Sequence, residues 1–550
     1  MSASSKKKLR KELNAAAMTE KQLQEQKESR KLRLYTTGFA IAIAAMILVV
    51  VVSRIFGTGI IPRSTTALTV GESKVSAAEL NHYYIDSVNN FLTQAGDYVS
   101  LFGLDTTKAL DEQFYNEAEE QTWADYFLDQ AAASAKNMYA VYNAAKAEGF
   151  TMSQESKDSI EAAVENMKLY GTMYGFSSAD AYIAAMYGEG CNEKTFRQYA
   201  EVQMVAQEYA AAKNESLTYD DAAIRAKEAE NFNAYSAFTY NYCYMATSKF
   251  NEGGTKDENG NVTYSDAEKE AGRAAAEAAA NTLAAATTIE ELDAAYAALP
   301  FNAEVENAKS TRQSGIQYAN VTTAIREWIT SDDRKAGDIT VIPSESTTHS
   351  HGDDEECTGE NDTTVVNGYY VVRFESKDDN LQNLVNVRHI LVSYEGGTTD
   401  EATGTTVYSD KEKLTARTAA EEILAAFEGG EKTEEAFAAL ATEKTTDTGS
   451  KENGGLYENV YPGQMVTAFN DWCFDASRKS GDTAIVETEY GCHVMYFVGN
   501  TDTTYRDFMI ESTLRSEDLT AWETGLIEAA EMELLNTKYV KTDLVLSSNS

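Results

Sequence analysis

Proline and cysteine are both scarce in this chain, whose 550 residues include 4 prolines and 5 cysteines. So little proline excludes a collagen-like or proline-rich disordered chain, and a hydrophobic content of 43% indicates ordinary folded cores. The cysteines are odd in number and form no CxxC pair, which argues against a disulfide framework. A chain of this length is expected to form roughly two to four domains.

Positive charge is also in deficit, with 47 Lys and Arg against 87 Asp and Glu and a net charge of -40. The exception is the segment 1–33, which is net +6, so that residues 55–550 carry -47. A surface this acidic repels phosphate backbones. The composition therefore excludes a nucleic-acid-binding body.

Long apolar runs are absent except at 34–53, where twenty residues between Arg33 and Arg54 carry no charge. A helix of that length spans about 30 Å, the thickness of a bilayer core. Because the basic residues lie before this run, we expect a cytoplasmic segment 1–33, a single transmembrane anchor at 34–53 and extracellular C-terminal domains. A cleaved signal peptide or a buried core helix is the alternative. No cysteine precedes Cys191, so a lipid-modified cysteine directly after the run is not expected.

Residues 65–231 are rich in Ala, Glu, Tyr and Met, and they predict an all-helical, chaperone-like domain. Its first long helix is expected to begin after Ser76, with Glu79 three residues on as its capping partner. A helical tail is predicted at 501–550.

An internal repeat occupies the region between these helical segments. GGTKDENGNVTYSDAEKEAGRAAAE, from Gly253, matches GGTTDEATGTTVYSDKEKLTARTAAE, from Gly396. EWITSDDRKAGDITVI, from Glu327, matches DWCFDASRKSGDTAIV, from Asp471. We therefore predict two tandem α+β domains, each an antiparallel sheet with surrounding helices, at 232–376 and 383–500. In the second copy we expect strands at 386–393, 484–487 and 492–498, and helices at 411–427, 433–442 and 464–476.

The second copy contains NVRHILVSYEGG, FAALATEKTTDTGSKENGGL, PGQMVTAF and VETEYGCHVMYF, in that order. These motifs resemble the parvulin family of peptidyl-prolyl cis/trans isomerases over about 115 residues. An anchor, a helical domain, a parvulin unit and a helical tail together resemble the PrsA-like extracytoplasmic foldases of Gram-positive bacteria. That plan leaves open whether 501–550 packs on 65–231.

The resemblance assigns roles to particular residues. It implies a buried catalytic network of His389, Asp447 and His493, with a pocket for the substrate proline that contains Leu456, Gln464, Met465, Phe469 and Tyr490. Rotation about an X-Pro bond needs no covalent intermediate, but it does need an apolar clamp and polar groups that favour the twisted imide. Met465 and Phe469, four residues apart, would share one face of the predicted helix. No metal or other cofactor is expected.

The first copy departs from this pattern. Tyr370 stands in place of His493, while Val321 and Ile325 replace Met465 and Phe469. We therefore interpret 232–376 as a degenerate parvulin-like domain. An insertion between Ile342 and Gly368 carries His349 and His351 beside carboxylates; a solvated loop is favoured there over a metal site.

The resulting hypothesis is a peptidyl-prolyl isomerase and foldase that assists secreted proteins outside the membrane. Its partners would be unfolded polypeptides with Xaa-Pro segments. The loop 393–409 has no cluster of basic residues, so phosphorylated substrates should have no advantage. The alternative is a non-catalytic holdase that uses the parvulin-like domains to bind peptides, and the oligomeric state stays open.

Overall fold

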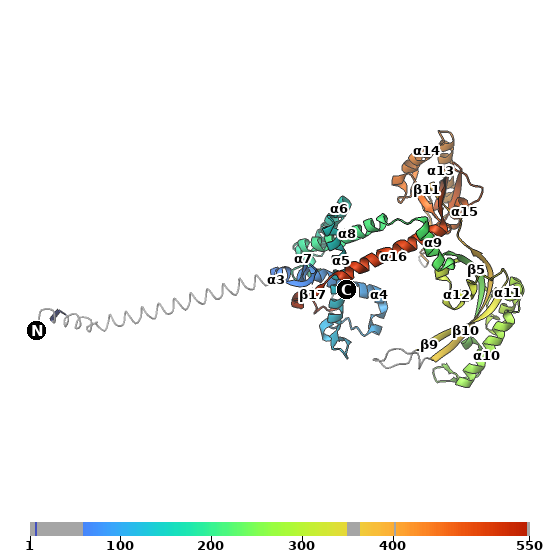
Figure 1. Cartoon of the computed structure of the whole chain (residues 1–550), viewed down its shortest axis with the longest axis horizontal. Coiled ribbons are helices and arrows are strands. Elements are labelled where there is room, and N and C mark those ends of the chain that lie inside the picture. Colours follow the sequence, from blue (N-terminus) through green and yellow to red (C-terminus); the bar gives the residue numbers. More distant parts are fainter. Residues whose placement is uncertain (1–5, 8–58, 349–362, 401–402, 547–550) are drawn as a thin grey trace. The chain divides into compact units, whose positions relative to one another are not determined.

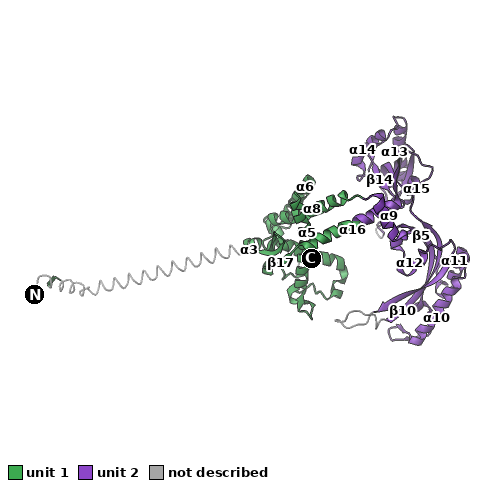
Figure 2. Cartoon of the chain, viewed as in Figure 1, with its two compact units in different colours: residues 1–218, 516–550 green, residues 219–515 purple. Residues whose placement is uncertain are grey.

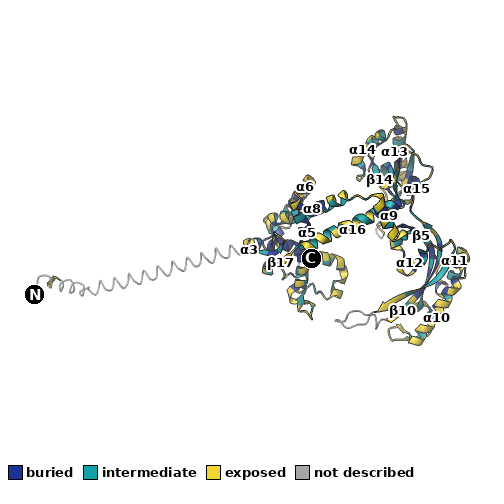
Figure 3. Ribbon diagram, in the orientation of Figure 1, coloured by how far each residue is buried: buried dark blue, intermediate teal, exposed yellow. Residues whose placement is uncertain are grey.

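The structure, a computed structural model, describes residues 6–7, 59–348, 363–400 and 403–546 (Figure 1). It divides into two compact units, one of residues 1–218 with 516–550 and the other of residues 219–515 (Figure 2). Buried residues concentrate in the sheets and in the helix faces that cover them (Figure 3).

Unit 1 is built mainly of helices. Its long helices are α4 (Ala77–Ala95), α5 (Trp123–Ala147), α6 (Gln154–Met173), α7 (Ala179–Tyr187) and α8 (Glu193–Ser216). Shorter elements are α3 (Ile60–Ser64), η1 (Gly96–Phe102), η2 (Leu110–Glu112), β3 (Phe114–Asn116) and β4 (Gln121–Thr122). The Ser76 hydroxyl accepts from the Glu79 amide at the start of α4, which confirms the predicted cap.

A three-stranded sheet joins the two chain segments of unit 1. Strand β1 (Thr66–Val70) pairs with both β2 (Ser73–Ser76) and β17 (Met532–Leu534), and Leu68 lies opposite Leu534. After η8 (Thr537–Tyr539), Val540 and Leu544 pack into the same core as Leu80 and Phe127. The sequence had predicted an all-helical domain at 65–231. This was wrong, because that range itself contains β1 to β4, and the tail adds the strand β17.

The predicted fold class needs a second correction, which concerns the transmembrane helix. No helix among the described residues is long and apolar enough to cross a membrane. Charged residues interrupt even the long ones: α5 carries Asp125, Asp129, Lys136 and Lys146. The anchor expected at 34–53 lies outside the described residues. The fold class is thus corrected to a mixed α and β structure with a parvulin-like domain, and the transmembrane helix is not retained.

Unit 2 begins with α9 (Asp221–Glu230) and η3 (Phe232–Tyr235), followed by the first repeat. The strands of this repeat are β5 (Ala237–Ala246), β6 (Thr255–Lys256), β7 (Val262–Thr263), β8 (Thr311–Gln317), β9 (Ile339–Thr348) and β10 (Thr363–Asp378). Its helices are η4 (Thr247–Phe250), α10 (Asp266–Leu283), α11 (Ile289–Ala297), η5 (Pro300–Asn302), η6 (Tyr318–Asn320) and α12 (Thr323–Ile329).

The second repeat follows directly. Its strands are β11 (Asn383–Ser393), β12 (Thr398–Thr399), β13 (Thr406–Val407), β14 (Leu456–Val460), β15 (Thr483–Thr488) and β16 (Gly491–Thr504). Its helices are α13 (Asp410–Glu428), α14 (Glu434–Lys444), η7 (Lys451–Asn453) and α15 (Thr467–Cys473), before α16 (Tyr505–Ala529). The sequence missed β14 and placed the start of α15 too early.

The two repeats share one topology. Their main sheets have the orders β8-β5-β10-β9 and β14-β11-β16-β15. A small detail is also repeated: the Gly254 amide donates to Glu268 at 2.9 Å, and the Gly397 amide donates to Glu412 at 3.0 Å. The internal repeat in the sequence is thus confirmed as a structural duplication.

The side chain of Arg506, at the start of α16, is fully buried and fastens several segments of unit 2. It pairs with Glu228 of α9 and donates to the Asp379 carbonyl, between the repeats, at 3.2 Å. It also donates to the Ser236 hydroxyl at 3.3 Å, and its guanidinium lies 3.7 Å from the centre of the Phe232 ring. One cation therefore holds the entry to the first repeat, the linker and α16 together.

Candidate active site

The two predicted histidines lie on the central strands of the second repeat. The β11–β16 register places Leu391 opposite His493 and His389 opposite Met495. Because residues two apart on a strand point to the same face, both imidazoles project from one face of the sheet. Their exposed fractions are only 3% for His389 and 6% for His493.

A glycine allows another strand to approach His389 closely. The His389 amide donates to the Gly455 carbonyl at 2.9 Å, and Gly455 has a φ of 73°. A Cβ at this position would lie 2.2 Å from the His389 carbonyl oxygen. Only glycine fits both requirements, so the segment before β14 is held tightly against the strand that carries His389.

A line of hydrogen bonds connects the candidate catalytic groups. His389 Nδ1 and His493 Nδ1 are 3.0 Å apart, and His389 Nε2 lies 2.9 Å from Asp447 Oδ2. At the other end, the Thr488 hydroxyl is 2.8 Å from His493 Nε2. The structure thus brings together the three residues that the resemblance implied, and it adds Thr488.

The partners in this line fix where the protons are. An ionised Asp447 can only accept, so His389 carries its proton on Nε2 and its Nδ1 accepts from His493 Nδ1–H. His493 Nε2 is then free to accept from Thr488. Burial lowers the pKa of His389 despite the opposing hydrogen bond to Asp447 and its charge. Burial and the neighbouring His389 lower the pKa of His493 to about 4, so both imidazoles are neutral at pH 7.

Asp447 stays ionised although it is partly buried. Burial alone would raise its pKa, but hydrogen bonds from Ser450, His389 and Tyr457 outweigh burial and lower the pKa to about 2. The Ser450 hydroxyl donates to Asp447 Oδ2 at 2.5 Å and the Tyr457 hydroxyl at 3.0 Å. The pKa of Tyr457 is raised to about 12 by its burial and by the Asp447 charge, so the phenol keeps its proton.

An apolar wall stands beside this network. Phe469 of α15 is 2% exposed, and its ring meets His389 and His493 edge to face, with centroid distances of 5.6 and 5.4 Å. Met465 is half-buried and packs against the same cluster. It precedes α15, however, because the helix begins at Thr467 with Val466 as its cap. The prediction that Met465 and Phe469 share one helix face was therefore wrong.

The side chains of the other predicted pocket residues form no hydrogen bond with the network in the described part of the chain, although the Tyr490 amide donates to the Thr488 hydroxyl at 3.2 Å. Leu456, on β14 opposite Arg388, does not belong to the apolar cluster around Phe469; its neighbour Tyr457 does. Gln464 is exposed, and its side chain accepts from the Tyr461 amide at 3.1 Å. Tyr490 is 61% exposed in the turn between β15 and β16.

Three hydroxyl groups of the site were not predicted: Ser450, Tyr457 and Thr488. Ser450 follows Asp447 by three residues, and its hydroxyl also lies 3.2 Å from His389 Nε2. Strand alternation could have identified Tyr457, because it points to the face opposite Leu456. Thr488 precedes His493 by five residues across a tight turn, and strand pairing across that turn was the available signal.

The first repeat has tyrosines in the corresponding positions. Gly368 pairs with Ala246 as Gly491 pairs with Ser393, so Tyr370 corresponds to His493 and Tyr242 corresponds to His389. The two tyrosine rings are 5.9 Å apart. Ile325 of α12 lies in the same cluster, where the second repeat has Phe469. The first repeat thus keeps the fold of the site without its histidines.

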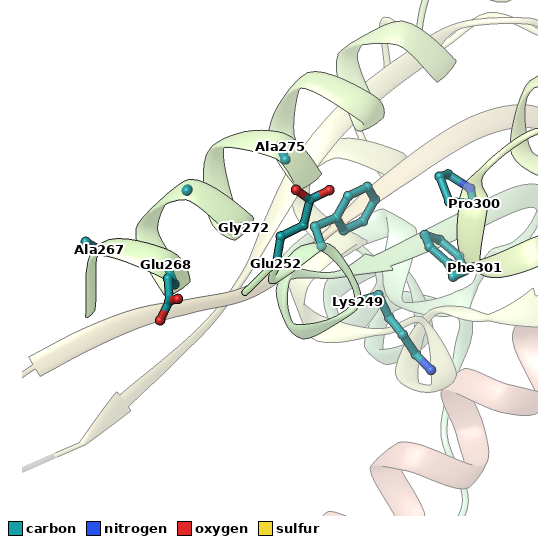
Figure 4. A pocket seen from close by; sticks show the side chains of 10 residues that line it. Lys249, Glu252, Ala267, Glu268, Gly272, Ala275, Pro300 and Phe301 are labelled. Carbon is teal, nitrogen blue, oxygen red and sulfur yellow. The ribbon is translucent and has the colours of Figure 1, made fainter. Parts of the chain in front are cut away.

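A cavity of about 440 Å³ lies elsewhere in the first repeat, beside α10 and η4. Figure 4 shows Ala267, Gly272 and Ala275 along α10, with Pro300 and Phe301 across from them. None of its lining residues corresponds to the histidine network. The insertion with His349 and His351 lies outside the described residues, and the described part of the chain holds no cluster that could bind a metal.

Comparison with known proteins finds a family model that matches the second repeat and the last strand of the first. Residues 369–500 match the family model described as PPIC-type PPIASE domain. Foldase protein PrsA 1 of Listeria innocua is 32% identical over 158 residues, which cover 27% of this chain and 45% of that protein. Foldase protein PrsA 2 of Listeria monocytogenes is 38% identical over 76 residues, covering 14% of this chain and 25% of the relative.

A solved structure, the peptidylprolyl isomerase PrsA from Bacillus anthracis, is 22% identical and covers 28% of this chain and 59% of its own, with a TM-score of 0.17. The chain thus spans less than half the length of the curated relatives named above.

Proposed function

We propose that this chain, whose residues 369–500 match the PPIC-type isomerase domain of the parvulin type, is a peptidyl-prolyl cis/trans isomerase that acts as a foldase on unfolded polypeptides. The observation that carries the proposal is the neutral, hydrogen-bonded line Thr488–His493–His389–Asp447 beside Phe469. Following the family resemblance, we place its action outside the cytoplasm, on secreted proteins that contain Xaa-Pro bonds.

The proposed mechanism follows from the chemistry of the amide. Rotation about the X-Pro bond has a barrier of about 18–20 kcal/mol because it breaks the resonance of the amide. The twisted imide has less charge separation than the planar one, so an apolar surface favours it. Phe469 and Met465 supply that surface. Two imidazoles that burial keeps neutral, and whose orientation the hydrogen bonds fix, form an uncharged polar floor next to it.

Asp447 acts through His389. Four groups donate hydrogen bonds to its carboxylate: the His389 ring, the Ser450 and Tyr457 hydroxyls, and the Gly449 amide at 3.2 Å. It therefore fixes the His389 tautomer, and through it the tautomer of His493, without taking part in proton transfer. We propose that it is a positioning residue, while the predicted contacts of Leu456, Gln464 and Tyr490 with substrate stay proposals.

The deciding experiment measures isomerisation of a short Xaa-Pro peptide by the full chain, alongside a refolding assay limited by proline isomerisation. We expect acceleration that His493→Ala strongly reduces. The matched control is Tyr370→Ala in the first repeat, which should leave the rate on the peptide unchanged. No acceleration by the unmodified chain, or equal losses in both variants, would refute the proposal.

The second candidate function is that of a holdase, which binds polypeptide without catalysis. The paired tyrosines of the first repeat favour this function for the domain 232–376. We propose that 232–376 is a silent domain that binds polypeptide. In an aggregation assay with a proline-free client, His493→Ala should then protect as well as the unmodified chain. If protection disappeared together with isomerisation, holding and catalysis would share one site.

A further inference from the structure

An apolar surface in unit 1 is left exposed between α4 and α5. Large side chains of η1 and β3 point into solvent: Leu101 is 78% exposed, Tyr98 67%, Phe102 58%, Phe114 52% and Tyr115 47%. Five such residues within eighteen positions are unusual for a water-facing surface, where large apolar side chains are normally scattered singly. We call this set the η1–β3 face.

Rings beneath the η1–β3 face hold part of it in place. Phe102 rests on Phe91, with a centroid distance of 5.6 Å, and Tyr115 stacks on Tyr126 at 4.2 Å. Phe91 and Tyr126 both contact the buried Trp123, at 5.2 and 5.6 Å. Phe102 and Tyr115 thus belong to a single aromatic cluster. A partner would meet side chains that are already ordered, so binding would cost little side-chain entropy.

A cavity of about 420 Å³ opens next to the same segment. Val99 and Leu104 contribute apolar parts of its lining, and Asp97 and Asp105 contribute carboxylates. Asp105 pairs with Lys108 at 3.2 Å, but both side chains are exposed and such a pair contributes little. Asp97 forms no ion pair with any described residue. The cavity therefore combines an apolar lining with net negative charge.

The charge around the η1–β3 face has one sign. Residues 96–122 contain seven carboxylates and one lysine, a net charge of -6. The carboxylates belong to Asp97, Asp105, Asp111, Glu112, Glu117, Glu119 and Glu120. Such a rim attracts cationic segments and repels acidic ones, including a second copy of this acidic chain. Charge complementarity therefore indicates a basic partner.

We infer that the η1–β3 face binds unfolded polypeptide segments in which an arginine or lysine stands next to aromatic or aliphatic side chains. The basic side chain enters the cavity between Asp97 and Asp105, while its apolar neighbours lie on Leu101, Phe102 and Tyr115. This inference rests on the proposed foldase function and gives it a class of client: segments chosen by charge and apolarity, independently of proline.

The test uses the full chain and a labelled, unstructured twelve-residue peptide that alternates arginine with leucine and phenylalanine and contains no proline. Fluorescence anisotropy gives its Kd. A peptide with glutamate in place of arginine should bind at least tenfold more weakly. The double variant Asp97→Asn with Leu101→Ser should raise the Kd for the arginine peptide at least fivefold. Both residues are exposed, so the variant should fold.

The matched control is Met173→Ser, at the end of α6 in the same unit, where the side chain is 68% exposed. It should change the Kd less than twofold. An equal effect of the control, or equal binding of the arginine and glutamate peptides, would overturn the inference. Sedimentation velocity tests whether a second copy of the chain covers the η1–β3 face. A dimer that Leu101→Ser abolishes would assign the face to that second copy and would also overturn the inference.

Isomerase activity on a short Xaa-Pro peptide separates this inference from the proposed function. The double variant should keep the full rate. Loss of peptide binding with an intact rate supports a separate client site, whereas an unmodified chain that binds the arginine peptide but lacks isomerase activity would refute only the proposed function.

Discussion

Three donors converge on one oxygen of Asp447, and this sets the character of the candidate site at the scale of single residues. His389 Nε2, the Ser450 hydroxyl and the Tyr457 hydroxyl all meet Oδ2. A carboxylate accepts all of them, whereas an amide would turn one donor group toward other donors. The site therefore depends on an ionised group that does not itself face the reaction.

Asp447→Asn should for this reason lower isomerase activity while the protein stays folded. Leaving a buried donor unpaired costs about 1–3 kcal/mol, which corresponds to a fall of about 5- to 150-fold in kcat/KM. The measurement is the rate on a short Xaa-Pro peptide. Asp475→Asn, in an exposed turn of the same repeat, is the control and should have little effect. Full activity of Asp447→Asn would remove its positioning role.

The pH dependence follows from the lowered pKa values. The pKa of His493 is about 4 in the folded protein against an ordinary value of 6.5, and that of Asp447 is about 2 against 3.8. In both cases the unfolded state binds the proton more readily, so acid destabilises the fold. We expect the His493 contribution to be lost as pH falls from about 6.5 to 4, and that of Asp447 from about 4 to 2.

Denaturant unfolding between pH 8 and about pH 2 measures this loss, with His493→Gln as the comparison that should flatten the upper part of the curve. Activity should be constant from pH 8 down to about 5. A rate that titrates near pH 6.5 would instead show that an imidazole of the site is exposed to water and charged.

At the scale of elements, the two repeats make Phe469 and Ile325 natural counterparts. Phe469 lies on α15 and Ile325 on α12, and the exposed fractions are 2% and 1%. Each fills the space between a helix and the central strands of its own sheet. The difference between them is that Phe469 also touches two histidines.

Phe469→Ala and Ile325→Ala should each destabilise unit 2, by about 3–5 and 2–5 kcal/mol respectively, because each leaves a cavity in a core. Only Phe469→Ala should also reduce the isomerisation rate, measured at a temperature where both variants are folded. A comparable loss of rate in Ile325→Ala would mean that the first repeat contributes to catalysis.

Periodicity and repetition in the sequence were enough to predict most elements of the second repeat. They located α13, α14, the strand that carries His389 and the start of the strand that carries His493 to within a few residues, because each has a clear apolar pattern or cap. The end of the His493 strand was placed six residues too early. They missed β14, a short strand after two glycines. The start of α15 was misplaced because Met465 and Phe469 fit a helical spacing although the helix begins only at Thr467, between them.

The candidate site, too, was predicted only in part from the sequence. The family motifs identified His389, Asp447 and His493. The hydroxyl groups that fix the positions of their protons lie in loops and at the ends of strands. Ser450 and Thr488 are ordinary residues in the sequence, and only strand pairing and the turn geometry bring them within hydrogen-bond distance. A prediction from local pattern has no access to such contacts.

At the scale of the whole molecule, unit 2 depends on the buried cation of Arg506. It contacts residues near position 230, near 379 and at the start of α16, which are far apart in the sequence. Because the guanidinium is fully buried, removing it leaves Glu228 with Arg225 alone and takes a donor from the carbonyls of Phe232 and Asp379.

Arg506→Met should therefore destabilise unit 2 by about 3–5 kcal/mol, the usual cost of breaking a buried ion pair. Thermal or denaturant unfolding of the full chain measures this. Arg417→Met removes an exposed arginine of α13 that also makes two ion pairs, and it should cost less than about 1 kcal/mol. Similar losses in the two variants would show that Arg506 does not hold the segments together.

The pairing of Leu68 with Leu534 determines when unit 1 can complete its fold during synthesis. Strand β1 leaves the ribosome early, but its partner β17 follows more than 450 residues later. Both repeats, which pair only strands of their own, can complete their sheets in the interval. Until β17 has been synthesised, the core of unit 1 lacks Val540 and Leu544 and stays open to solvent. The proposed foldase thus completes its own first unit last.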